Sequence, residues 1–126
     1  MEKKLNKLRA LTKMALDVQM MKLQQIAEAE AEKTKQISLL HKLEADRRAS
    51  LMESGGADLA LYGGADKRWA TWKQRQVSVL NTQKAALIAE RDEQKLRTQK
   101  AFGKDEAVRR LTDTARETAR ISQSRI

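Results

Sequence analysis

Few side chains in this sequence have the type and spacing that catalysis requires. His41 is the one histidine, cysteine is absent, and the phosphate-cradling pattern GxxxxGK[ST] does not occur. A lone histidine on a charged helix is far more often a solvated residue than a metal ligand or a base. The carboxylate pairs Glu90/Glu93 and Asp105/Glu106 have basic neighbours, which favours surface ion pairs over acid–base chemistry. We therefore expect a protein that is not an enzyme, with no catalytic residue, no metal site and no cofactor.

Basic side chains gather near both ends of the chain. The net charge is +9, and acids and bases are mixed throughout the 126 residues. Such a surface attracts anionic partners, which include nucleic acid, acidic lipid and acidic protein. Arginine predominates in the second group, which suits bidentate contacts with carboxylates. The two groups are Lys3, Lys4, Lys7, Arg9 and Lys13 near the start, and Arg109, Arg110, Arg116, Arg120 and Arg125 near the end.

Aromatic residues are concentrated in one glycine-rich stretch, ESGGADLALYGGADKRWATW, residues 53–72. It contains Tyr62, Trp69 and Trp72. Two interpretations remain open. Both tryptophans seal the end of a helical pair, or one faces the pair while the other, with Tyr62, forms an exposed anchor for a partner.

The elements that must position these residues are two long helices. The chain lacks proline and is rich in Ala, Leu, Lys, Arg, Glu and Gln, which favour helix. We predict a single domain, residues 1–126, with a helix over 2–52, a loop over 53–65 and a helix over 66–125. The glycine pairs of the loop interrupt the helix, Asp58 caps a short turn, and Asp66 caps the second helix. We expect Gly103 to be tolerated within that helix.

Apolar residues in the two arms pair with a near-constant sum of residue numbers if the chain folds back at the loop. This predicts an all-α, antiparallel two-helix coiled-coil hairpin with a glycine-rich closed end. Whether the hairpin closes within one chain or swaps between chains stays open. The predicted pairs are Leu5 with Ala115, Leu8 with Leu111, Leu11 with Val108, Val18 with Phe102, Leu40 with Leu80, Leu43 with Val77, and Leu51 with Trp69.

No apolar run approaches the ~20 residues that a membrane span needs. The basic N-terminus is not followed by an unbroken apolar segment, so we do not interpret it as a secretory signal. We expect a cytoplasmic protein without a transmembrane segment.

The second arm resembles the FliJ family, the coiled-coil stalk component of the flagellar type III export ATPase. The resemblance lies in ADKRWATWKQRQVSVLNTQKAALIAERD and in KAFGKDEAVRRL. The first arm is similar only in character. Of the candidate site residues, Arg109 and Arg110 lie on a stretch that is similar to the family.

The resemblance implies a role for both ends of the hairpin. The paired termini would insert into a hexameric export ATPase and promote its activity, with the protein peripheral to the cell membrane at the flagellar base. The body would reach the membrane export gate and exchange export chaperones. For the ATPase we select Lys4, Leu8, Arg9, Arg109, Arg110 and Arg116, and for the closed end Tyr62, Trp69 and Trp72.

Two other functions compete with this one. The net positive charge suits a helical protein that binds nucleic acid, although the alternation of acids and bases and the scarcity of aromatics argue against it. A phasin-like protein that coats a surface is the other, and the lack of a broad apolar face argues against that.

Overall fold

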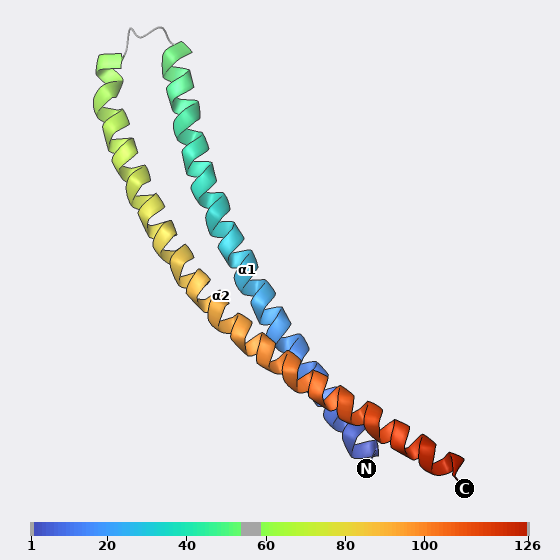
Figure 1. Ribbon diagram of the computed structural model, residues 1–126. Coiled ribbons are helices and arrows are strands. Elements are labelled where there is room, and N and C mark those ends of the chain that lie inside the picture. The colour runs from blue at the N-terminus through green and yellow to red at the C-terminus, as the bar shows by residue number, and fades with distance from the viewer. Residues whose placement is uncertain (1, 54–58, 126) are drawn as a thin grey trace. The chain divides into compact units, whose positions relative to one another are not determined.

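Two long helices account for almost all of the described chain. The computed structural model describes residues 2–53 and 59–125. Helix α1 spans Glu2–Glu53 and helix α2 spans Leu59–Ser124, and the two run antiparallel (Figure 1). Neither helix contains proline, and most of their residues have high helix propensity. The predicted all-α helical hairpin is confirmed.

The start of the second helix differs from the prediction. Helix α2 begins at Leu59 rather than Asp66, and it continues through Gly63 and Gly64. Asp66 is therefore not an N-cap. Each glycine disfavours helix by about 1 kcal/mol relative to alanine. Shortly after them in the sequence, Asp66 and Trp69 both contact Arg47 of α1. Helix α1 ends at Glu53, one residue beyond the predicted end. The first glycine pair, at residues 55–56, and the predicted cap at residue 58 lie outside the described residues.

Gly103 lies within α2 without interrupting it, as predicted. The space that a β-carbon would occupy at this position is open. The glycine is therefore not required by a close approach of another part of the chain.

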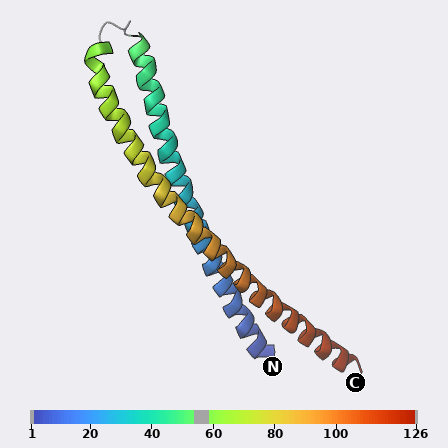
Figure 2. The ribbon, with the colours of Figure 1, turned by 60° about the vertical axis from the view of Figure 1, so that its left-hand side comes forward.

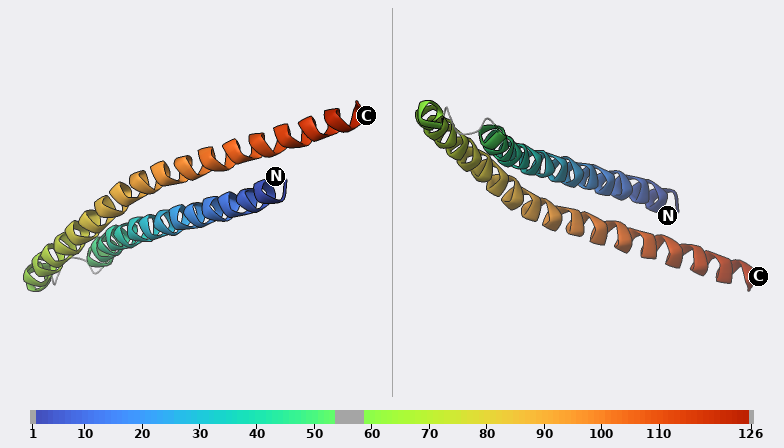
Figure 3. Two further views of the ribbon diagram at one scale, coloured as in Figure 1. Left: turned by 90° about the horizontal axis from the view of Figure 1, so that it is seen from below. Right: turned by 90° about the horizontal axis from the view of Figure 1, so that it is seen from above.

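The chain divides into two compact units. The terminal unit comprises Met1–Ile26 and Glu90–Ile126, and the central unit comprises Ala27–Ala89. In the terminal unit the two helices lie side by side, and α2 extends past the beginning of α1 (Figures 2 and 3). The last turns of α2 therefore present their whole circumference to solvent.

A seam of buried and half-buried residues runs along each helix of the terminal unit. Successive positions alternate between steps of four and three, which is the spacing of a left-handed coiled coil. Its apolar members include Leu16, Ile26 and Val108, which are 8–9% exposed. The seam positions are Leu5, Arg9, Thr12, Leu16, Gln19, Leu23 and Ile26 on α1, and Arg91, Gln94, Thr98, Ala101, Asp105, Val108, Thr112 and Ala115 on α2.

Eight of these 15 seam positions are polar, and several of the predicted apolar residues lie beside the seam rather than on it. On α1, Leu11 and Val18 do not face α2, because the next residue of each lies on the seam instead. Thr12 Oγ1 donates a hydrogen bond to the Asp105 carboxylate at 3.0 Å. The Gln94 amide donates to Gln19 Oε1 at 2.7 Å and to the Gln19 carbonyl at 3.1 Å.

The central unit differs from the prediction at Leu43 in the same way. Glu44, rather than Leu43, reaches across to α2, where it forms an ion pair with Lys73. Leu43 is 46% exposed, whereas Leu40, Val77 and Leu80 are half-buried, as predicted. The prediction therefore identified some seam positions and missed others, because polar side chains that pair with each other also occupy the seam.

The displaced apolar residues are exposed. In the terminal unit they include five residues that the prediction placed between the helices. These are Leu8 at 43%, Leu11 at 62%, Val18 at 47%, Phe102 at 55% and Leu111 at 56% exposure. Within the described residues, no helix is long and apolar enough to cross a membrane.

Candidate functional site

The terminal unit brings the two predicted groups of ATPase-binding residues together. Lys4, Leu8 and Arg9 lie at the beginning of α1, and Arg109, Arg110 and Arg116 lie in the last turns of α2. We call residues 2–13 and 104–124 the open end. All of these cations except Arg9 are exposed, and Arg9 lies on the seam.

The six residues do not form one continuous patch. Successive residues of a helix are about 100° apart around its axis, so neighbours of a seam residue lie on opposite flanks of the pair. Leu8 comes just before the seam residue Arg9, whereas Arg109 comes just after the seam residue Val108. Because the helices are antiparallel, Leu8 and Arg109 face different sides of the open end.

The arginines of α2 differ in how far their charge is offset. Arg109 and Arg110 share the carboxylate of Glu106, at 4.0 and 3.8 Å. Arg116 has no acid within ion-pair distance among the described residues. Arg120 pairs with Glu117 at 2.7 Å, and the hydrogen bond from this pair raises the pKa of Arg120. The open end therefore carries a net positive charge that is exposed to solvent.

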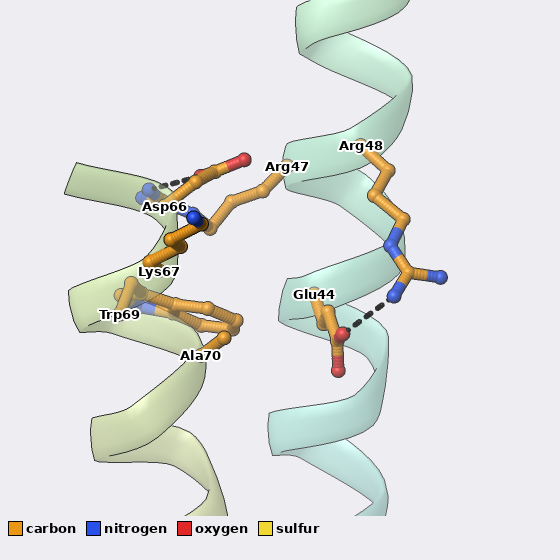
Figure 4. Close-up of a pocket in the computed structure, with 7 residues that line it drawn as sticks. All are labelled: Glu44, Arg47, Arg48, Asp66, Lys67, Trp69 and Ala70. Carbon is orange, nitrogen blue, oxygen red and sulfur yellow. Dashed lines mark hydrogen bonds and ion pairs between the residues drawn. The ribbon is translucent and has the colours of Figure 1, made fainter. Parts of the chain in front are cut away.

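The closed end, which we define as residues 44–53 and 63–75, has a different chemistry. Arg47 on α1 reaches across to α2, where its Nη2 donates to the Asp66 carboxylate at 3.0 Å (Figure 4). Its guanidinium carbon also lies 4.8 Å from the centre of the Trp69 ring. A cation over an indole face is attracted by about 0.5–1 kcal/mol at an exposed site. Arg47 therefore links α1 to α2 at the closed end through an ion pair and a cation–π contact.

A second ion-pair system lies one turn away. Glu44 accepts from Arg48 on its own helix at 2.8 Å and pairs with Lys73 of α2. The hollow between the helices here has a volume of about 220 Å³. Its lining is shown in Figure 4 and consists of Glu44, Arg47, Arg48, Asp66, Lys67, Trp69 and Ala70. Both of its acids are paired with bases, and among its lining cations Lys67 has no ion pair within the described residues.

The two tryptophans face different surroundings. Trp69 lies at the interface with α1, and Trp72 is 48% exposed. Their ring centres are 6.3 Å apart. Beside Trp72 lies a shallow depression of about 350 Å³ that is lined by Lys67, Arg68, Thr71 and Arg75. Trp69 thus packs between the two helices at the closed end, and Trp72 is an exposed aromatic ring with basic side chains beside it. Tyr62 lies within α2, and its side chain is outside what the structure describes.

Among the described residues, no group of three or more His, Asp or Glu side chains could hold a metal ion. Comparison of the chain with protein families, with characterised proteins and with solved structures found no match. The assignment of a function therefore depends on the geometry of the chain and on the resemblance of its second arm.

Sequence reasoning missed one surface, the exposed apolar stripe of α1 that begins at Leu8. Its signal was present, since Leu8, Leu11, Ala15 and Val18 follow coiled-coil spacing. The prediction places Leu8, Leu11 and Val18 between the helices because they are apolar, whereas all three are exposed.

Proposed function

We propose that this protein is a non-enzymatic coiled-coil stalk or adaptor of a flagellar type III secretion ATPase. In this proposal the open end enters the ATPase ring and promotes ATP hydrolysis and protein export. The observation that carries the proposal is the pairing of the two chain ends in one unit with exposed cations on both helices. The identity of the partner comes from the resemblance of the second arm to the FliJ family.

The charge of the open end supports an acidic partner. Lys4 on α1 and Arg116 on α2 have no ion pair within the described part of the chain. An exposed cation that is not offset by a neighbouring acid contributes fully to long-range attraction, and this raises association rates at low ionic strength. An arginine-rich tip would therefore be drawn into a ring lined by carboxylates.

The construction of the open end also suits a role inside a ring. Arg109 and Arg116 follow seam residues, whereas Lys4 and Leu8 precede them, so one flank of the tip carries arginines and the other carries a lysine and a leucine. A tip with unlike sides contacts the subunits of a ring unequally. It would thereby favour different conformations in successive subunits.

Charge reversal at Arg109 and Arg110 tests whether the open end contacts the ATPase. Replacing Arg109 and Arg110 with glutamate reverses two charges beside Glu106 without altering a seam residue. We expect the double variant to lose most of its stimulation of a purified flagellar export ATPase. The matched control is Lys35→Glu with Lys42→Glu, two exposed cations of the central unit.

Both variants should keep the helical circular dichroism of the parent. Stimulation that is unaffected in the Arg109 and Arg110 variant would exclude insertion of this end. An equal loss of stimulation in the Lys35 and Lys42 control would show that the effect depends only on the net charge of the chain.

The closed end offers a second contact surface in the same proposal. Trp72 is exposed and has Arg68 and Arg75 beside it. Aromatic and arginine side chains dominate the energetics of protein interfaces. We assign this surface to the membrane export gate or to an export chaperone, and Trp72→Ala should weaken that contact while stimulation of the ATPase remains.

A further inference from the structure

One flank of the terminal unit carries an unpartnered coiled-coil stripe. On α1, four residues each lie just before a seam position, at steps of three, four and three. Leu11 is 62% exposed and Val18 is 47% exposed. This is the spacing with which one helix packs against another. The four residues, which we call the apolar stripe, are Leu8, Leu11, Ala15 and Val18.

The same flank of α2 is basic. Arg97, Lys100 and Lys104 also lie just before seam positions, and in an antiparallel pair this places them beside the apolar stripe. All three are exposed. None has an ion-pair partner among the described residues. We call these three residues the basic edge.

A groove separates the apolar stripe from the basic edge. Its volume is about 230 Å³, and both helices line it. Ala15 of the stripe and all three residues of the basic edge are among its lining residues. Small or polar side chains complete the lining, namely Thr12, Gln19 and Ala101. Their size leaves room for the side chains of a third element.

We propose that this groove binds an amphipathic helix of a partner protein whose apolar face is flanked by acidic residues. The apolar face would pack on Leu11, Ala15 and Val18. Carboxylates on one edge of that helix would meet Arg97, Lys100 and Lys104. The side chains of such a helix project as a ridge into the groove between two helices.

Charge complementarity selects this occupant over two others. A second copy of this chain, which carries a net charge of +9, would bring a basic edge against a basic edge. An anionic membrane would attract the basic edge, but a flat surface cannot fill a groove whose lining lies between two helices. A helix with an acidic flank satisfies both the groove and the charges.

The inference does not rest on the ATPase proposal. Leu11 and Lys104 lie within the open end, but the residues selected for the ATPase contact differ from those of the groove apart from Leu8. Arg109 lies on the opposite flank from Lys100 and Lys104, and Arg110 lies on the outer face of α2, two residues from the nearest seam positions. Variants of one surface should therefore leave the other intact. Leu8 is omitted from the test for this reason.

The probe is a labelled, lactam-stapled peptide of about 21 residues, with leucine at the two core positions of each heptad and glutamate beside them. Fluorescence anisotropy measures its binding to the full chain. A peptide with the same leucines and lysine in place of glutamate is the control probe. We expect the glutamate peptide to bind at least about tenfold more tightly than the lysine peptide, since a tenfold change corresponds to about 1.4 kcal/mol.

Two double variants test the two sides of the groove. Lys100→Glu with Lys104→Glu reverses two charges, and Leu11→Gln with Val18→Gln removes the apolar contact. Each should weaken binding of the glutamate peptide about tenfold or more. The matched control is Lys13→Glu with Lys95→Glu, two exposed cations that follow seam residues on the opposite flank. It should change the affinity by less than about threefold.

Four results would overturn the proposal. One is equal binding of the two peptides, and another is an equal loss in the control variant. The third is that the chain binds phosphatidylglycerol vesicles and not the peptide, and that the groove variants no longer bind the vesicles. This result would make the surface a lipid-binding one. Light scattering of the full chain should show a monomer, and a dimer that the Leu11 and Val18 variant dissociates would assign the groove to a second copy.

Discussion

Replacement of Gln94 with alanine tests whether the polar seam stabilises the terminal unit. Gln94 is 3% exposed, and its amide nitrogen lies 2.7 Å from Gln19 Oε1 and 3.1 Å from the Gln19 carbonyl oxygen. Each hydrogen bond contributes a net of about 0.5–1.5 kcal/mol. Because Gln19 is only half-buried, water replaces part of what is lost. We expect the variant to lose about 1–2 kcal/mol of unfolding free energy.

The measurement is thermal or urea unfolding followed by far-ultraviolet circular dichroism. For a chain of this size, 1 kcal/mol shifts Tm by roughly 4 °C. The expected decrease is therefore about 4–8 °C. Gln99→Ala is the matched control, since Gln99 is an exposed glutamine of the same helix. It should be neutral or slightly stabilising, because alanine has the higher helix propensity.

A further variant separates the hydrogen bond from the volume of the side chain. Replacing both Gln94 and Gln19 with leucine removes both partners together and leaves no buried amide unpaired. Such exchanges are often neutral or stabilising, so the double variant should unfold at or above the parental Tm. If Gln94→Ala were as stable as Gln99→Ala, Gln94 would not bridge the two helices and the seam would be misplaced.

Three other predictions concern the packing of the helices. Gly103→Ala should raise stability by about 0.5–1 kcal/mol in urea unfolding, since the space beside this glycine is open and α2 is helical there; a loss of stability would indicate a close contact. Leu16→Ala should destabilise the chain by about 2–3 kcal/mol in the same assay, because Leu16 is 9% exposed, and a loss below about 0.5 kcal/mol would contradict its burial. Thr12→Cys with Asp105→Cys should form an intramolecular disulfide on mild oxidation, because Thr12 contacts Asp105; a gel that shows only disulfide-linked dimers would indicate pairing between chains instead.

The helical hairpin was predictable from the sequence because it depends on simple features. The absence of proline and the high helix propensity of both arms favour two long helices. The glycines at residues 55–56 and 63–64 located the turn approximately. The exact start of α2 was not predictable, because a glycine pair favours an interruption of a helix, whereas Gly63 and Gly64 lie within α2.

The register was harder to predict, because an assignment by apolar residues alone ignores pairs of polar ones. Gln94 and Asp105 are 3% and 6% exposed, yet neither would be chosen for a seam from its type. Their partners, Gln19 and Thr12, are distant in the sequence. Only the steps of four and three, followed strictly through polar positions, could have found the seam.

The candidate site was partly accessible from the sequence. The clustering of basic residues at both ends predicted the open end, because a hairpin must bring its ends together. The orientation of the tryptophans depends on Arg47, which lies on the other helix and holds Trp69 at the interface. The division of the open end into two unlike flanks follows from the register and could not be known before it.

The central claim is that the open end, rather than the closed end, contacts the export ATPase. Site-specific photo-crosslinking tests it most directly, with a photoreactive phenylalanine analogue placed at Arg116 or at Trp72 of the full chain. Both positions are exposed, so neither substitution disturbs a buried contact. We predict a crosslink to the ATPase from position 116 and none from position 72. A crosslink from position 72 alone, or equal yields from both, would contradict the account.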